Sequence, residues 1–337
     1  MKIIQATLVL ALAAMPALAD FSYKHETKIV GGAMAGPMKM AMKMSKATRE
    51  AMSGATYIKG NKSANQSGGM VTIYDLDAET ITTVNNDKRE YSVMSFAEMQ
   101  QAMARMSEKM SGKKGEANVK YKVDIRDGKK TQDVYGYPAK LTAVAISIES
   151  TDEKGNSGAM EMVNDMWLST GIAGSAEMTA FHQRMGEKLA GAGGQNLGMV
   201  GAMMKQKGFE EAMKEFQANA GNLQGVPVLT VMRMAQAGNL DAVMADSGKI
   251  PEDKPEAESD SKPSMGGVLR GMGGFGGFGR KKNSEPADEP QQGGGSAALM
   301  ELATRQFDFS TAPVDESRFA VPAGYKQVES EMKKLLK

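Results

Sequence analysis

The sequence predicts an α+β protein in which helices pack against one face of an antiparallel sheet. Short β-type segments separated by Gly, Asn, Asp or Ser recur along most of the 337 residues, while a few segments carry apolar residues at helical spacing. Strands outnumber helices, which favours a single domain made of a sheet and the helices that cover it. The chain has no cysteine, so disulfides, catalytic thiols and thiolate metal sites are excluded.

Residues 1–19 have the pattern of a secretory signal. Lys2 precedes an apolar run from Ile3 to Ala14, and the small-residue end Ala17-Leu18-Ala19 stands before Asp20. The run is too short to span a membrane, so we expect cleavage between Ala19 and Asp20 and a soluble product that is periplasmic or secreted. Without Lys2 the chain has as many basic as acidic residues, which gives no reason to expect nucleic-acid binding.

Residues 21–93 are typical of an antiparallel meander. Its expected strands are FSYKHETKIV, ATYIKGNKS, MVTIYDL, ETITTVN and KREYSVM, and the stretch MKMAMKM is expected to be a further strand. On such a strand Met38, Met40, Met42 and Met44 would share one face. Residues two apart on a strand are roughly 6.5 Å apart, whereas Cu(I) needs about three converging soft ligands. We therefore interpret these methionines as apolar lining, with a Cu(I) or Ag(I) site as the alternative.

Three helices are expected, each with one apolar stripe. The first starts at Ser95, whose hydroxyl can form a capping box with Glu98. The second runs from about Ala176 to Leu189 and the third from about Phe209 to Ala218. The stripes are Phe96, Met99, Met103, Met106 and Met110, then Met178, Phe181, Met185 and Leu189, and finally Phe209, Met213 and Phe216.

Strands resume between and after these helices. The expected ones are NVKYKVDIRDG, KKTQDVYGY, KLTAVAISIES, AMEMVNDMWLS, GVPVLTVMRMAQ and ALMELATRQFDFS. GVPVLTVMRMAQ is apolar on both faces, which predicts a central strand covered on both sides. A short amphipathic helix with Met332, Leu335 and Leu336 is expected near the C-terminus.

Residues 246–295 are rich in Gly, Pro and charge, which predicts a disordered insertion. Because strands lie on both sides of it, we expect a loop within one domain formed by residues 20–245 and 296–337. Phe275 and Phe278 stand near basic residues, a combination suited to weak contact with an anionic membrane. The basic residues are Arg270, Arg280, Lys281 and Lys282. The alternative is a tolerated spacer without function.

Several blocks of the sequence resemble the bacterial domain-of-unknown-function family 4412, which is similar in pattern to the outer-membrane lipoprotein carrier superfamily (the LolA and LolB type). The blocks are ATYIKGNKS, TIYDLDAETITTVNNDKREYSVMSFAEM, NDMWLS, GVPVL and FAVPAGYK. The resemblance covers nearly the whole chain after the signal except the insertion, and its most specific block is Thr56 to Met99. It implies a curved, incomplete antiparallel barrel, LolA-like, with helices on the concave face, in a periplasmic or secreted protein. It implies no activity, because lipoprotein carriage belongs to distant relatives.

Motifs of catalysis and of metal binding are absent from the sequence. HExxH, GxSxG and a glycine-rich phosphate loop do not occur, and His25 and His182 are too few for a histidine metal site. The segment from Asp75 to Glu79 begins like a calcium loop, but Thr80 and Asn86 stand where glycine and glutamate are needed, so a hairpin turn is expected.

Three other polar or aromatic residues receive structural interpretations. Glu161 and Asp165 could in principle act as acid and base, but nothing brings them to a pocket, and both are expected to be solvated. Trp167 is expected to anchor the edge of the sheet against a helix, with stacking on a ligand as the alternative.

The sequence therefore favours a non-enzymatic binding or carrier protein for an apolar ligand such as a lipid or acyl chain. Methionine is abundant, and its flexible side chain suits an adaptable apolar cavity. The candidate ligand-binding residues come from the helix stripes: Met99, Met103, Phe181, Met185 and Leu189. No cofactor is expected. The alternatives are a methionine-rich Cu(I)- or Ag(I)-binding periplasmic chaperone and an envelope interaction module without a ligand cavity.

Overall fold

The computed structural model describes residues 20–45, 50, 52–111, 118–151, 157–192, 209–236, 238–251 and 297–334. The chain divides into two compact units, Met1–Lys249 with Ser296–Lys337 and Ile250–Gly295. All the strands and helices named here belong to the first unit. The predicted signal, most of the predicted insertion and the basic and aromatic residues between 270 and 282 lie outside the described residues.

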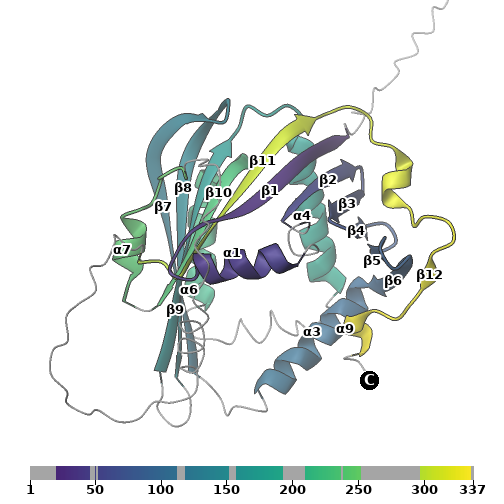
Figure 1. Ribbon diagram of the computed structural model, residues 1–337, viewed down its shortest axis with the longest axis horizontal. Helices are drawn as coiled ribbons and strands as arrows, with labels where there is room; N and C mark the ends of the chain where they lie inside the picture. The colour runs from purple at the N-terminus through teal and green to yellow at the C-terminus, as the bar shows by residue number, and fades with distance from the viewer. Residues whose placement is uncertain are drawn as a thin grey trace, which may run out of the picture. The chain divides into compact units, whose positions relative to one another are not determined.

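A twelve-stranded sheet dominates the structure (Figure 1), which confirms the α+β class. The strand order is β12-β6-β5-β4-β3-β2-β1-β11-β10-β9-β8-β7, so β12 and β7 are the two edges and the sheet is not closed into a barrel. The pairing of β12 with β6 is parallel, and the other pairings are antiparallel. The strands are β1 (Phe21–Gly31), β2 (Ser53–Lys59), β3 (Lys62–Ser67), β4 (Met70–Asp75), β5 (Thr80–Asn85), β6 (Glu90–Ser95), β7 (Asn118–Val134), β8 (Tyr137–Thr151), β9 (Ser157–Ser169), β10 (Val226–Gln236), β11 (Met300–Ser310) and β12 (Lys326–Gln327).

The helices are short compared with the sheet. They are α1 (Ala35–Met44), α3 (Phe96–Ser111), α4 (Ser175–Ala192), α6 (Phe209–Ala218), α7 (Leu240–Met244) and α9 (Glu331–Lys334), with 3₁₀ turns η1 (Ala220–Leu223) and η3 (Glu316–Phe319). α4 contacts β1 and β2, and α3 contacts β6 and α4. The Thr142 hydroxyl on β8 donates to the backbone oxygen of Asn222 in η1, which places η1 on the same face as Thr142. We call this face the helical face; α7 packs on the opposite one, the α7 face.

The strand predictions hold over most of the sheet, with differences in β2, β3 and β7. ATYIKGNKS was predicted as one strand but contains the turn between β2 and β3, where Gly60 has a positive φ of 53°. NVKYKVDIRDG and KKTQDVYGY form one strand of 17 residues, interrupted by an irregularity between Asp127 and Thr131. The polar residues there were interpreted as a strand end, but Lys129 takes a positive φ of 49° and the pairing with β8 continues. As expected, Asp75 starts a hairpin turn: its Oδ1 accepts hydrogen bonds from the backbone N–H groups of Asp77 and Ala78.

The helix predictions near Ser95, Ala176 and Phe209 are confirmed by α3, α4 and α6. The capping box at the start of α3 is present, because the Ser95 hydroxyl accepts from the Glu98 N–H at 3.1 Å and Glu98 Oε2 accepts from the Ser95 N–H at 2.8 Å. Lys333, next to the end of α9, forms an ion pair with the same Glu98 at 2.8 Å. The capping residue therefore also ties the C-terminal segment to α3.

The strand predicted for MKMAMKM is wrong, because these residues lie in helix α1. Met, Lys and Ala are all good helix formers, and Pro37 stands in the first turn, where its missing N–H breaks no helical hydrogen bond. In a helix Met38 and Met42 share one side and are half-buried, whereas Met40 points away and is 50% exposed. The four methionines therefore do not form one lining. The side chain of Met44 lies outside the described part.

The α7 face carries two apolar clusters. Under α7, the buried side chains of Ala145, Val163, Ala235, Val243 and Ala298 pack together. On β3, β4 and β5, Ala64, Ile73 and Val84 are covered by Phe319, Val321 and Tyr325 from the segment after β11. The first cluster joins the two chain segments on either side of the predicted insertion, since Val243 precedes it and Ala298 follows it.

Candidate functional site

The five predicted ligand-binding residues lie on two helices that touch. Met99 and Met103 are on α3, and Phe181, Met185 and Leu189 are on α4. The Gln100 side-chain amide donates a hydrogen bond to the backbone oxygen of Leu189, which holds the two helices together. Phe181 is buried and the other four side chains are half-buried. The structure therefore brings these residues to one helix pair, but they do not line either of the two pockets described below.

A larger apolar surface lies on the helical face of the sheet and was missed by the sequence analysis. Side chains of directly paired residues share a face, so the register aligns them in rungs across the strands. One rung is Ile146–Met162–Met234–Met300, and the next is Val144–Asn164–Met232–Leu302–Ile29. Beyond the first rung, towards the ends of β8 and β9, Ile148 pairs with Met160. We call these three levels the methionine surface.

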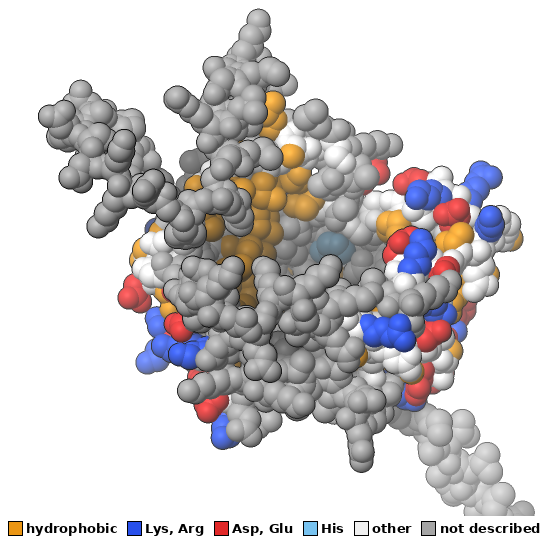
Figure 2. All heavy atoms as spheres, turned by 90° about the horizontal axis from the view of Figure 1, so that it is seen from below, with side chains coloured by type: hydrophobic (Ala, Val, Ile, Leu, Met, Phe, Trp, Pro, Cys, Tyr) orange, Lys and Arg blue, Asp and Glu red, His pale blue; other side chains and the backbone are white. Residues whose placement is uncertain are grey.

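The methionine surface is only partly covered. Its methionines are half-buried except Met160, which is 47% exposed, and Figure 2 shows hydrophobic side chains gathered in a hollow of the molecule. The pattern that could have indicated the surface is the spacing of methionines in AMEMVNDMW and VLTVMRM, where they recur two or four positions apart and so share one strand face. The sequence analysis interpreted VLTVMRM as part of a central strand covered on both sides and AMEMVNDMW simply as a strand, because alternation alone does not say which face remains accessible.

Polar residues follow the methionine surface along the same strands. The next rung is Thr142–Met166–Thr230–Thr304–Thr27, in which the hydroxyls of Thr27 and Thr304 are 2.9 Å apart. One step further, His25 pairs with Gln306. Burial lowers the pKa of His25 below its ordinary value, which favours the neutral imidazole. The helical face thus changes from apolar to polar in the direction from Met300 to Gln306.

No Asp, Glu, Lys or Arg side chain projects from the helical face of β1, β2, β9, β10 or β11 within their described residues. The charged residues of these strands alternate onto the α7 face. They include Lys24, Glu26, Lys28, Glu161, Asp165, Arg233, Glu301 and Arg305. On these five strands the segregation leaves an uncharged helical face, which suits an uncharged or apolar ligand. The neighbouring strands β8 and β7 add one ion pair to this face, between Lys140 and Asp127 at 2.8 Å.

The α7 face holds a buried ion pair. Asp165 and Arg233 are 0% and 2% exposed, and their charged atoms are 2.6 Å apart. Asp165 also accepts hydrogen bonds from the Ser247 hydroxyl and the Gly248 N–H, at 2.6 and 2.7 Å. The prediction that Asp165 is solvated is therefore wrong. Its partners come from another strand and from the segment after α7, and no local pattern connects them.

Gly248, which donates its N–H to Asp165, stands where a larger residue would not fit. Its φ is +77°, and a Cβ atom there would lie 2.8 Å from Leu141 Cδ2. Its backbone oxygen accepts a hydrogen bond from Lys130, whose ammonium group also lies 5.5 Å from the centre of the Trp167 ring. Trp167 is fully buried on β9, an interior strand, so the prediction that it anchors a sheet edge is wrong.

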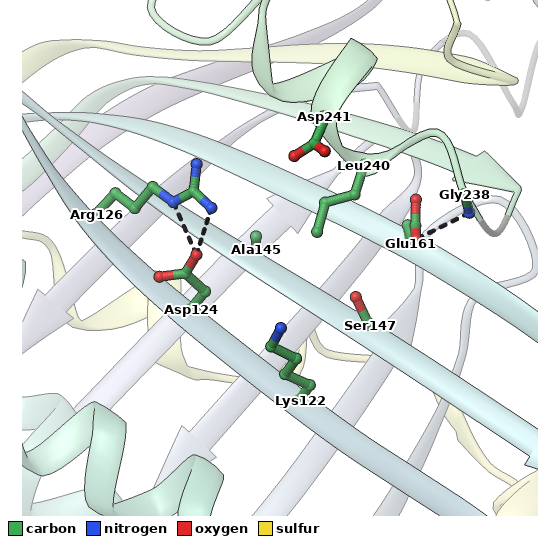
Figure 3. A pocket seen from close by; sticks show the side chains of 9 residues that line it. All are labelled: Lys122, Asp124, Arg126, Ala145, Ser147, Glu161, Gly238, Leu240 and Asp241. Carbon is green, nitrogen blue, oxygen red and sulfur yellow. Dashed lines mark hydrogen bonds and ion pairs between the residues drawn. The ribbon is translucent and has the colours of Figure 1, made fainter.

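A polar pocket of about 310 Å³ lies on the α7 face, between β7, β8, β9 and the start of α7 (Figure 3). It is lined by Lys122, Asp124, Arg126, Ala145, Ser147, Glu161, Gly238, Leu240 and Asp241. Arg126 pairs with Asp124 at 2.6 Å, and Glu161 accepts a hydrogen bond from the Gly238 N–H at 3.1 Å. Glu161 is thus half-buried at a pocket wall, where we had expected full solvation. A second pocket of about 210 Å³ lies near Tyr57 and Arg318.

The described residues contain no group of three His, Asp or Glu side chains that could hold a metal ion. Within the same ranges, no helix combines the length and apolar character needed to span a membrane.

Comparison with known proteins gives no family. No family model matches the chain, and a search of curated proteins found no match either. The resemblance to family 4412 therefore stays a prediction, and functional argument must come from the two faces of the sheet.

Proposed function

We propose that the protein binds and carries an apolar ligand such as a lipid or an acyl chain, without catalysing a reaction. The ligand lies on the methionine surface, across β8, β9, β10 and β11. The observation that carries the proposal is the alignment of Met162, Met234 and Met300 in one half-buried rung beside Met232 and Leu302 in the next. Methionine side chains are flexible and polarizable, so they adapt to chains of different shape.

The finer fold assignment belongs to the same proposal. An open sheet with its longer helices α3 and α4 on one face, together with the resemblance to family 4412, supports a LolA-like incomplete barrel whose helical face is concave. In this proposal the signal is cleaved between Ala19 and Asp20, and the mature protein works in the periplasm or outside the cell. Its intact mass, measured after recovery from the periplasm or culture medium, should correspond to a chain that begins at Asp20.

Transfer of an acyl chain from water to this surface gives a sufficient driving force. Each buried methylene contributes about 0.8 kcal/mol, so an acyl chain with many methylenes offsets the translational and rotational entropy that the ligand loses on binding. A charge placed in the middle of the surface would have to lose its hydration against the bound chain, which costs several kcal/mol. Binding should therefore be very sensitive to one charged substitution on the helical face and insensitive to the same substitution elsewhere.

Titration of the purified protein with a fluorescent acyl probe tests the proposal. We expect Met234→Glu to weaken probe binding at least tenfold. Met70→Glu is the matched control, because Met70 is a 40% exposed methionine at the start of β4, and it should leave binding unchanged. Melting curves of both variants establish whether each is folded. Failure of the wild-type protein to bind the probe, with no lipid in extracts of protein purified from its native compartment, would contradict the proposal and favour an envelope interaction module.

A Cu(I)- or Ag(I)-binding chaperone is the second candidate, and the structure changes the residues to test. Directly paired strand residues have Cβ atoms about 4.5–5.5 Å apart, so the thioethers of Met162, Met234 and Met300 can converge on one soft ion. Met38 and Met42 on α1 give only two neighbouring sulfurs. Cu(I) titration against a competing chelator should distinguish the candidates: tight binding lost in Met162→Leu with Met300→Leu, but retained in Met38→Leu with Met42→Leu, would favour the metal.

A further inference from the structure

The helical face is polarised along the strands, and this polarity restricts the ligand that the proposed carrier function requires. Along β11 the helical face presents Gln306, Thr304, Leu302 and Met300 in order. Along β1 it presents His25, Thr27 and Ile29 in the same direction. The apolar and polar ends are therefore a property of the sheet and not of one strand, which suits a ligand with one apolar and one polar end.

The polar end contains an acceptor that is not used. The Gln306 Oε1 atom is buried and accepts no hydrogen bond from the described part of the chain. A buried acceptor without a donor is costly, so a donor at this position would be favoured. His25, its direct partner on β1, presents a neutral imidazole with one donor and one acceptor nitrogen. The pair is suited to a hydroxyl group, which both donates and accepts.

The distance along β11 shows how far the acyl chain has to reach. From Gln306 to Leu302 there are two steps of two residues, or about 14 Å, and Met300 lies one further step away, at about 20 Å. The hydrocarbon core of a bilayer is about 30 Å thick and contains two opposed chains, so one chain extends about 15 Å. A chain whose head lies at Gln306 therefore crosses the threonine rung and reaches the Leu302 level of the methionine surface.

No Asp, Glu, Lys or Arg side chain projects from the described helical face of β1, β9, β10 or β11 to pair with an ionised head. Lys140 of β8 does project from this face, but β8 is three strands from β11 and Lys140 is paired with Asp127 of β7 at 2.8 Å.

We propose that the ligand is an uncharged amphiphile with a single acyl chain, whose hydroxyl-bearing head lies at the His25–Gln306 pair and whose chain runs along the strands over the methionine surface. This inference rests on the proposed carrier function and adds the polarity, the charge and the orientation of the ligand. It also excludes a peptide segment as the ligand, because a peptide would present a row of backbone polar groups to the methionines.

Three displacement probes of equal chain length test this inference on the full chain. Monopalmitoylglycerol is uncharged and has hydroxyl donors, methyl palmitate is uncharged and has none, and palmitate is an anion. At pH 7.5 we expect monopalmitoylglycerol to displace a fluorescent acyl probe at about tenfold lower concentration than either of the other two. Gln306→Leu should remove the difference between monopalmitoylglycerol and methyl palmitate while leaving methyl palmitate binding unchanged.

Gln66→Leu is the matched control. Gln66 pairs with Ala55 on β2, lies on the α7 face, and should leave all three affinities as in the wild type. If Gln306→Leu does not fold, His25→Leu tests the same pair and should give the same selective loss. The inference would be overturned if all three probes displaced the fluorescent probe equally or if palmitate were preferred. It would also be overturned if only a protein or peptide displaced the fluorescent probe, or if the selectivity were unchanged in the folded variants. The first two results leave the carrier function standing, whereas absence of any probe binding contradicts that function itself.

Discussion

At the scale of single residues, Asp165 shows what local sequence cannot provide. It stands in a strand that was predicted correctly, and its side chain was assigned to solvent because an isolated acid usually lies there. Its partners are Arg233 on β10 and the Ser247–Gly248 segment, 68 and more residues away. Pairing at that distance depends on strand order, which the residue itself does not encode. The capping pair Ser95 and Glu98 was predictable because both partners lie within one turn of helix.

The buried ion pair gives a direct prediction. Asp165→Ala leaves the Arg233 guanidinium buried without its counter-ion and should lower the free energy of unfolding by about 3–5 kcal/mol in urea titrations. Asp165→Leu combined with Arg233→Met should recover most of this loss, because it removes both charges. Lys24→Met is the control: its ion pair with Asp308 is more than half exposed, so the loss should be much smaller than that of Asp165→Ala. Equal losses in the Asp165 and Lys24 variants would show that burial does not determine the effect.

The two histidines predict how stability depends on pH. Burial lowers the pKa of His25 and of His182 below the ordinary value, so the unfolded chain binds protons more readily than the folded one. Stability should therefore be complete above the unfolded pKa of about 6.5 and fall as the pH drops from there towards the lower folded pKa. Melting temperatures measured from pH 7.5 to 5.5 should decline in the wild type and decline less in His25→Gln with His182→Gln. An equally steep decline in the double variant would assign the effect to other groups.

At the scale of elements, helix stripes and punctuated strands were predictable, and the methionine alternation was not. α3, α4 and α6 each have apolar residues at helical spacing, while most strands from β1 to β6 are separated by clear turn residues. The exception is Gly60–Asn61, which separates β2 from β3 inside a segment that was predicted as one strand. MKMAMKM contains good helix formers in an order with period two, so propensity and pattern disagree. Propensity prevails in α1, where no neighbouring strand pairs with these residues in the described sheet.

The capping box predicts the stability of α3. Ser95→Ala removes the acceptor for the Glu98 N–H and should cost about 1 kcal/mol in the free energy of unfolding. Ser95→Asp, which keeps an acceptor at the cap, should cost clearly less. Thr179→Ala is the comparison within α4, because the Thr179 hydroxyl is exposed and bonds only to the Ser175 backbone oxygen inside the helix, so it should change stability by less than about 0.5 kcal/mol. If Ser95→Ala were as stable as the wild type, the capping box would not contribute to the stability of the protein.

At the scale of the whole molecule, the sequence predicted the class of fold and the presence of one large sheet, but not which surface is available to a ligand. Helix stripes such as Met99 and Met185 were the natural candidates, because a stripe is visible in one segment. The methionine surface is assembled from β8, β9, β10 and β11, and only the register aligns Met162 with Met234 and Met300. β11 follows β10 in the sheet although about sixty residues separate them in sequence.

Two deletions of different length test which residues after α7 belong to the folded sheet domain. β10 and β11 pair directly, and Ala298 packs with Val243, so the sheet can form without residues 252–296. Replacing those residues by a short Gly-Ser linker should leave a cooperative transition and a similar melting temperature. Deleting residues 246–295 removes also Ser247 and Gly248, which leaves Asp165 with only Arg233 as its partner, so this variant should lose about 2–4 kcal/mol more. Urea unfolding of both variants measures the difference in stability. Equal stability would show that the hydrogen bonds from Ser247 and Gly248 contribute little. Loss of cooperative unfolding in the shorter deletion would show that residues 252–296 are part of the folded core.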